Sequence, residues 1–111
     1  MTPLYNRLLA ELHEEARFLT NPKAQELHEL LLEILERHRA RVGPAFESIV
    51  EDVGLDFQAF SSRLKERLLH DDALINDPLD QVKLAGLLLK PSTTMFWPHV
   101  SALLIDLRES N

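Results

Sequence analysis

Residues 22–42, PKAQELHELLLEILERHRARV, are the stretch that decides the fold. Asn21 can cap the first turn of a helix here, and Pro22 suits its first position, where a backbone N–H would have no partner in the helix. Gly43-Pro44 marks the expected end of this helix. At about 100° per residue its apolar side chains span roughly 200°, which is wider than the usual stripe of about 100°. The rest of the chain, or a second copy of it, must therefore cover this helix from more than one side.

The segment before residue 22 predicts a second helix that packs against the first one. Thr2-Pro3 is a good start for a helix that ends at about Phe18, and the connection to Asn21 is very short. Two helices joined by so short a turn must be antiparallel neighbours. Counting back from the turn places Tyr5 near His38 in this hairpin.

The remaining sequence contains signals for three or four more helices and none for a strand. Gly54 is the expected C-cap of a third helix, Asp56 and Asp77 are expected N-caps, and Pro91 ends the fifth helix. The expected helices cover Pro44–Val53, 57–69, 78–90 and Pro98–Arg108. We therefore expect an all-α protein: a compact bundle of five or six helices, built on an N-terminal antiparallel helical hairpin, with residues 1–111 forming a single domain.

Composition restricts the classes of function. The 111 residues carry a formal net charge of −6, which disfavours binding to nucleic acid or to an anionic membrane surface. There is no cysteine, so disulfides and thiol chemistry are excluded, and a reducing compartment is expected. No apolar run approaches the roughly 20 residues of a membrane span, and the acidic N-terminal segment does not resemble a secretory signal. These features predict a cytoplasmic protein without a membrane segment.

The histidines are the residues most able to carry metal or acid–base chemistry in a chain without cysteine. None lies three or four residues from another, so no paired ligand motif exists, and we expect neither a metal nor a cofactor. We expect histidines on the surface, with one exception. His38 falls within the apolar stripe of the 22–42 helix, where it is either a helix-end histidine bonded to a neighbour such as Tyr5 or a pH-sensitive group. The five are His13, His28, His38, His70 and His99.

The other charged residues also lack a catalytic arrangement. The acidic runs have the spacing of solvated helix faces, and there is no glycine-rich phosphate loop or nucleophile motif. We therefore do not expect an enzyme and nominate no catalytic residue. Arg37, Arg39 and Arg41 end the expected 22–42 helix, where positive charge complements the helix dipole; the alternative is a docking site for an acidic partner.

One local pattern points to DNA. Residues 46–68 read as a short helix, a turn at Gly54 and a second helix. The run Val53-Gly54-Leu55, Gln58 and Ser62-Arg63 resembles the passage into the recognition helix of AraC-type regulators. It departs from that family at Ser61 and at Leu64-Lys65, where aromatic residues are usual. The resemblance implies a helix-turn-helix regulator whose second helix carries its polar residues outward and contacts DNA. Those residues are Gln58, Ser61, Ser62, Arg63 and Arg67.

An excess of apolar residues in the C-terminal third favours a protein partner instead. The helix that begins at Pro78 is apolar in nearly every direction, which is typical of a helix that is fully buried or part of an interface. Aromatic residues and methionine follow it, and such residues often anchor interfaces. The candidate partner-binding residues are Leu84, Leu88, Met95, Phe96 and Trp97. We expect a non-catalytic helical adaptor, regulator or inhibitor that acts by protein–protein contact, with a homodimer as one form that it can take; the alternative is the DNA-binding regulator.

Overall fold

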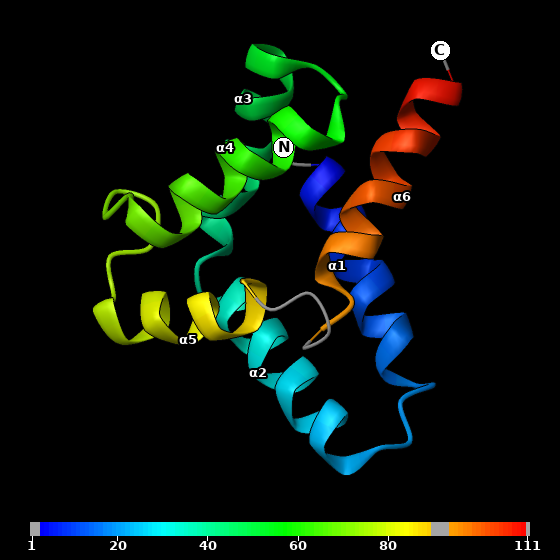
Figure 1. The fold of residues 1–111 in the computed structure, drawn as a ribbon, viewed down its shortest axis with the longest axis vertical. Helices are drawn as coiled ribbons and strands as arrows, with labels where there is room; N and C mark the ends of the chain where they lie inside the picture. Colours follow the sequence, from blue (N-terminus) through cyan, green and yellow to red (C-terminus); the bar gives the residue numbers. More distant parts are fainter. Residues whose placement is uncertain (1–2, 90–93, 111) are drawn as a thin grey trace.

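The computed structural model describes residues 3–89 and 94–110, and this part of the chain folds into six helices without a strand (Figure 1). Thr2 and Pro91, which were expected to cap one helix and to end another, lie outside the described residues. The helices are α1 (Pro3–Ala16), α2 (Pro22–Arg37), α3 (Arg39–Val53), α4 (Phe57–His70), α5 (Pro78–Leu88) and α6 (Phe96–Glu109). The all-α class and the six-helix bundle expected from the sequence are confirmed.

Three helices begin where the sequence predicts, and in each an acidic or amide side chain supplies the cap. The Asn21 Oδ1 atom accepts hydrogen bonds from two backbone N–H groups of the first turn of α2, at 2.9 and 3.2 Å. Asp77 likewise accepts two such bonds at the start of α5, and Asp56 accepts one, from the Ala59 N–H group, at the start of α4. These side chains supply partners for N–H groups of the first turn that have none within the helix.

The expected 22–42 helix is wrong as a single element, because the chain breaks at His38. This residue has φ −104° and ψ 19° and separates α2 from α3, while Gly43 and Pro44 lie inside α3 rather than ending a helix. Pro44 removes one backbone hydrogen bond from α3, and the helix continues past it. The break turns α3 back onto α1, and the rings of Tyr5 and Phe46 pack edge to face with their centroids 5.0 Å apart. Tertiary packing therefore overrides the local stop signal.

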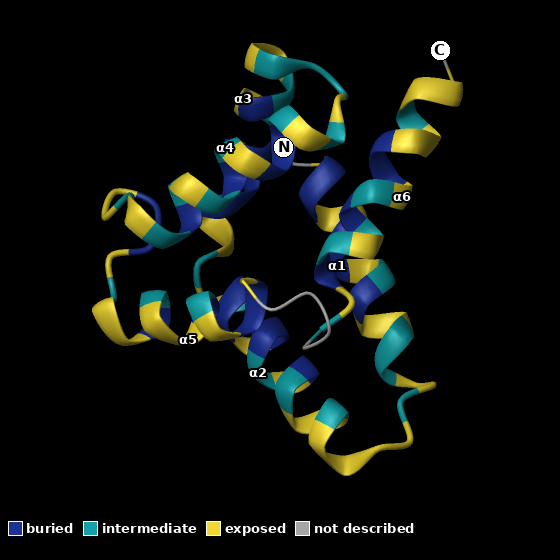
Figure 2. Cartoon of the chain, in the orientation of Figure 1, coloured by how far each residue is buried: buried dark blue, intermediate teal, exposed yellow. Residues whose placement is uncertain are grey.

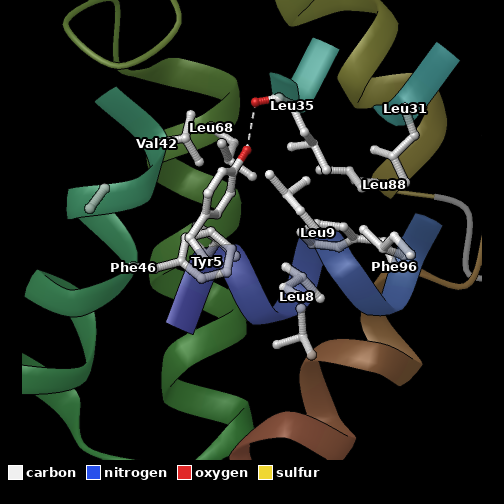
Figure 3. Close-up of a cluster of buried hydrophobic side chains, with 14 of the residues drawn as sticks. Tyr5, Leu8, Leu9, Leu31, Leu35, Val42, Phe46, Leu68, Leu88 and Phe96 are labelled. Atoms are coloured by element: carbon white, nitrogen blue, oxygen red, sulfur yellow. Dashed lines mark hydrogen bonds between the residues drawn. The ribbon is translucent and has the colours of Figure 1, made fainter. Parts of the chain in front are cut away.

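The core lies between α1 and the helices around it. Helix α1 contacts α2, α3 and α6, while α4 contacts α3, α5 and α6. The side chains of Tyr5, Leu8 and Leu12 are fully buried. The Tyr5 hydroxyl donates a 2.7 Å hydrogen bond to the carbonyl oxygen of Leu35, which lies in the last turn of α2 where carbonyls have no helical partner (Figure 3). This bond joins the start of α1 to the end of α2, so the antiparallel pairing of the first two helices is confirmed.

Helix α5 lies at the edge of the bundle, against α2 and α4 (Figure 1). In this position one side of α5 is buried against the bundle and the other is exposed. The described residues contain no helix that is long and apolar enough to cross a lipid bilayer.

Candidate functional site

The inner face of α5 belongs to the hydrophobic core. Leu84, Leu87 and Leu88 are almost completely buried, and Figure 3 shows Leu88 among the core side chains beside Leu31 and Phe96. At about 100° per residue these three leucines fall on one side of the helix. They point toward the helices that α5 contacts, which are α2 and α4.

The opposite side of α5 is apolar as well, but it is exposed. The side chains of Leu79, Val82 and Leu89 are 61%, 69% and 57% exposed, and Gly86 lies between them (Figure 2). These four residues fall within about 80° of one another around the helix, on the side away from the buried leucines. We refer to Leu79, Val82, Gly86 and Leu89 as the outer face of α5. Of the six large apolar side chains that are exposed in the described residues, three belong to this face.

A groove runs along one edge of the outer face. It has a volume of about 420 Å³ and lies between α4 and α5. Leu69 and Ala85 line its floor beside Val82 and Leu89, and Lys65, Glu66 and His70 stand at its α4 side. Its α5 side is mostly apolar, with Gln81 as the polar residue, and its α4 side carries Lys65 and Glu66 beside Leu69. Such a surface can accept an amphipathic helix or a flat apolar patch, and it offers no cluster of polar groups that converge on one point.

The five residues expected to form a partner surface do not form one together. Leu84, Leu88 and Phe96 are 0%, 1% and 0% exposed, so they are core residues and no partner reaches them in this structure. Phe96 and Trp97 also begin α6 instead of lying in a loop. Met95 is 43% exposed and is accessible to a partner.

Trp97 is partly buried because it is held at the C-terminal end of α5. Its indole N–H donates a 2.8 Å hydrogen bond to the carbonyl oxygen of Leu88, and the Lys65 ammonium lies 5.1 Å from the centre of its ring system. The Thr94 hydroxyl likewise donates to the Leu87 carbonyl. The start of α6 thus fixes the end of α5, and Met95, between these two anchors in the sequence, lies at the same end of the helix.

The other end of α5 is held by a buried carboxylate. Asp80 is 1% exposed, and its two oxygens accept hydrogen bonds from Arg37 at 2.8 and 2.7 Å. The His38 Nε2 atom donates a further hydrogen bond of 2.7 Å to Oδ2. Asp80 is the third residue of α5, where the positive end of the helix dipole favours a carboxylate. This cluster ties α5 to the junction of α2 and α3.

Two opposing effects act on the pKa of Asp80. Burial raises the pKa of this carboxyl group, since it disfavours the charged form. The hydrogen bonds and positive charges of Arg37 and His38 lower it by more, so the pKa lies below its ordinary value of 3.8. Asp80 is therefore charged near neutral pH, as a buried partner of an arginine should be.

The histidines correct two expectations. His38 forms a hydrogen bond with Asp80 and not with Tyr5, because the Tyr5 hydroxyl donates to the carbonyl oxygen of Leu35. His28 is buried rather than on the surface, and its Nε2–H group donates a 2.6 Å hydrogen bond to the Leu12 carbonyl oxygen. His28 faces α1 because the two helices of the hairpin are in contact there.

The arginines at the junction of α2 and α3 are engaged within the chain. Arg37 binds Asp80 and Glu33, and Arg39 binds Glu36 and the side chain of Asn6. Arg41 donates a 3.4 Å hydrogen bond to a carbonyl oxygen of the loop before α5. An acidic partner would have to compete with these contacts.

The segment expected to be a helix-turn-helix does contain two helices joined by a tight turn. Gly54 has φ +78° and ends α3, and α3 packs against α4. Gln58 and Ser62 are exposed, whereas Ser61 is buried, contrary to the expectation that it points outward.

Two of the three basic residues of this segment, Arg63 and Arg67, are paired with carboxylates, and the third, Lys65, lies over the ring of Trp97. Arg63 binds Asp52 at 3.1 Å, and Arg67 binds Asp71 at 3.2 Å. A phosphate backbone would have to displace these acids, which leaves little free positive charge on α4 for DNA.

A second apolar groove, of about 400 Å³, lies between α1, α3 and α6. Its two charged residues are already engaged: Arg7 binds Glu11 and Asp106, and Glu47 accepts a hydrogen bond from the Leu4 N–H group. Because both charged side chains are engaged within the chain, we do not treat this groove as a site. Residues 3–89 and 94–110 contain no group of three or more histidines and carboxylates that could hold a metal ion.

Comparison with protein-family models, with curated proteins and with solved structures finds no match for this chain.

Sequence reasoning identified α5 as apolar all round but assigned the wrong residues to its exposed side. When a helix is apolar in every direction, its sequence pattern does not show which side faces the core. The one signal that could have fixed it is Asp80, which shares the inner face with Leu84 and Leu87, but a lone aspartate is ordinarily taken to face solvent.

Proposed function

We propose that this chain is a non-catalytic protein-binding domain that docks an apolar helix on the outer face of α5. The observation that supports the proposal is that α5 is apolar on two opposite sides and only the inner side is covered. Scattered single exposed apolar residues are common on soluble proteins. Three large ones on one face of one short helix are not, and each would gain about 1.5–3 kcal/mol from complete burial.

The contacts that hold α5 in place at its two ends favour the same proposal. The Asp80 cluster holds one end of α5, and the hydrogen bonds to the carbonyls of Leu87 and Leu88 hold the other. A face on a helix that is fixed at both ends is preorganised, so a partner loses less free energy in ordering it. We infer from this, and from the absence of cysteine, a cytoplasmic adaptor, regulator or inhibitor.

The alternative is a DNA-binding regulator that uses α4. Two exposed polar residues, Gln58 and Ser62, support it, while the carboxylate partners of Arg63 and Arg67 oppose it. A DNA complex of this kind should weaken steeply with salt, and loss of Arg63 should weaken it further. Docking on α5 should be unaffected by duplex DNA.

Site-specific photo-crosslinking tests the proposed function. A benzophenone amino acid replaces Val82 on the outer face, and in a matched control it replaces Glu29, an exposed residue of α2. After irradiation in an extract of cells that contain the chain, we expect a covalent protein adduct from position 82 and none from position 29. An excess of unlabelled wild-type chain should suppress the adduct, whereas the Leu89→Glu variant should not. The same adducts at both positions, or none at position 82, would overturn the proposal.

A further inference from the structure

The residues of the outer face of α5 have the same spacing in both directions along the helix, with valine at one middle position and glycine at the other. They are separated by three, four and three positions, with leucine at both ends, Leu79 and Leu89, and with Val82 and Gly86 in the middle. Each of these pairs is centred on position 84. A helix face with this symmetry can pack against itself when a second copy runs antiparallel.

A twofold axis over position 84 makes the two middle residues complementary. In such a pair, residue i of one copy contacts residue j of the other, and j contacts i. Leu79 would lie against Leu89 of the second copy, and Val82 would lie over Gly86 of the second copy. The space above Gly86 is free: apart from its chain neighbours and the backbone of its own helix, no heavy atom lies within 4 Å of the position that a Cβ atom would take there. A valine of the other chain can occupy this gap, and the two backbones can then approach closely.

Resting on the proposed function, we infer that the occupant of the outer face is a second copy of this chain, whose α5 packs antiparallel across the twofold axis. Each copy supplies two leucines to the ends of the contact and one valine to the gap of the other. The four residues of the outer face carry no charge, and Lys83, an exposed residue of α5 about 40° from Leu79 around the helix, lies at the margin of this contact.

The dimer should be weak. The outer face consists of four residues, far fewer than the roughly 20–30 residues that each partner contributes to a standard interface. Each copy also carries a net charge of −6, and like charges repel over the Debye length of about 10 Å at 0.1 M salt. We expect a dissociation constant on the order of 10–100 µM, which is typical of a reversible rather than a permanent dimer.

Mixing two charged variants tests both the partner and the register. Leu79→Lys alone and Leu89→Glu alone should each raise the dissociation constant by at least about thirtyfold, because a charge then faces leucine at both ends of the contact. In an equimolar mixture of the two variants, one end of a mixed dimer pairs lysine with glutamate and the other keeps its two leucines. Sedimentation velocity should show that the mixture recovers dimer to within about tenfold of the wild-type dissociation constant. The recovery itself shows that both variants fold.

Ile105→Lys is the matched control, because Ile105 is an exposed apolar residue of α6 outside the outer face. It should leave the dimer unchanged. If the wild-type chain dimerises and the mixture of variants does not recover the dimer, the antiparallel register is wrong. A wild-type chain that stays monomeric up to about 500 µM overturns the inference altogether. The proposed function then still stands if position 82 forms an adduct with a different protein, and it falls if position 82 forms none.

Discussion

Asp80 is the single residue on which the placement of α5 depends most. It is the most deeply buried charged side chain in the described residues, and it accepts hydrogen bonds from both Arg37 and His38. Removing one member of such a cluster leaves the others buried without a partner. The resulting loss of folding free energy is larger than the net stabilisation that the intact cluster provides. A surface ion pair has no comparable effect, because water replaces the lost partner.

Asp80→Ala should lower the free energy of unfolding by about 3 kcal/mol, near the lower end for a buried ion pair because Arg37 is partly exposed to water. The matched control is Asp52→Ala, which removes the exposed pair with Arg63 and should cost less than about 1 kcal/mol. Urea denaturation followed by circular dichroism measures both. Equal effects of the two substitutions would show that the Asp80 cluster does not anchor α5.

Because Asp80 is charged in the folded chain, the free energy of unfolding should fall in acid. The pKa of Asp80 in the folded chain lies below its ordinary value of 3.8, so the folded state binds this proton less readily than the unfolded state. The contribution to stability is therefore complete above about pH 4 and is lost as the pH falls through the folded pKa. Asp80→Asn cannot titrate, so the stability difference between wild type and this variant should shrink from pH 5 toward pH 2. A difference that stays constant over this range would contradict the lowered pKa.

Among the elements, the boundary between α2 and α3 could not be predicted from local sequence signals, whereas several helix starts could. The caps at Asn21, Asp56 and Asp77 were predictable because each depends on a side chain and the next few backbone N–H groups. The break at His38 was not, because it depends on residues far along the chain. Asp80 holds the His38 ring, and Tyr5 takes the carbonyl of Leu35. Gly43-Pro44 is a strong local stop signal, but the packing of α3 on α1 outweighs it.

Replacing glycine by alanine should have opposite effects at two positions, Gly86 on the outer face of α5 and Gly54 at the end of α3. Gly86→Ala should raise the free energy of unfolding by about 1 kcal/mol, because alanine is the better helix former and nothing lies near the new Cβ atom. Gly54→Ala should lower it by about 1–3 kcal/mol, because Gly54 has φ +78° and ψ −159°, a region open almost only to glycine. Thermal and urea denaturation of dilute samples measure both effects. Destabilisation by Gly86→Ala would mean that something already covers the outer face of α5.

At the scale of the whole molecule, an all-α bundle and an excess of apolar residues could both be predicted from the sequence. The first depends on the number of helix signals and the second on the number of apolar residues. Which apolar residues form the core could not be predicted the same way. Leu84, Leu88 and Phe96 looked available to a partner, and the structure buries them, whereas Leu79, Val82 and Leu89 remain outside. The difference depends on how α5 is rotated in the bundle, and the bundle is set by contacts between segments that are distant in sequence. The packing of the core does not require the exposed apolar face of α5, and this is the feature that the proposed docking is meant to explain.

The most direct test of this account is the solution mass of the wild-type chain as a function of its concentration and of salt. We expect the average mass to rise from that of a monomer toward twice that value between about 1 and 500 µM. Raising sodium chloride from about 0.05 to 0.5 M should strengthen the dimer, because salt screens the repulsion between two chains of charge −6 while the apolar contact persists. A mass that stays monomeric throughout, or a dimer that salt dissociates, would contradict an apolar contact between two copies of α5.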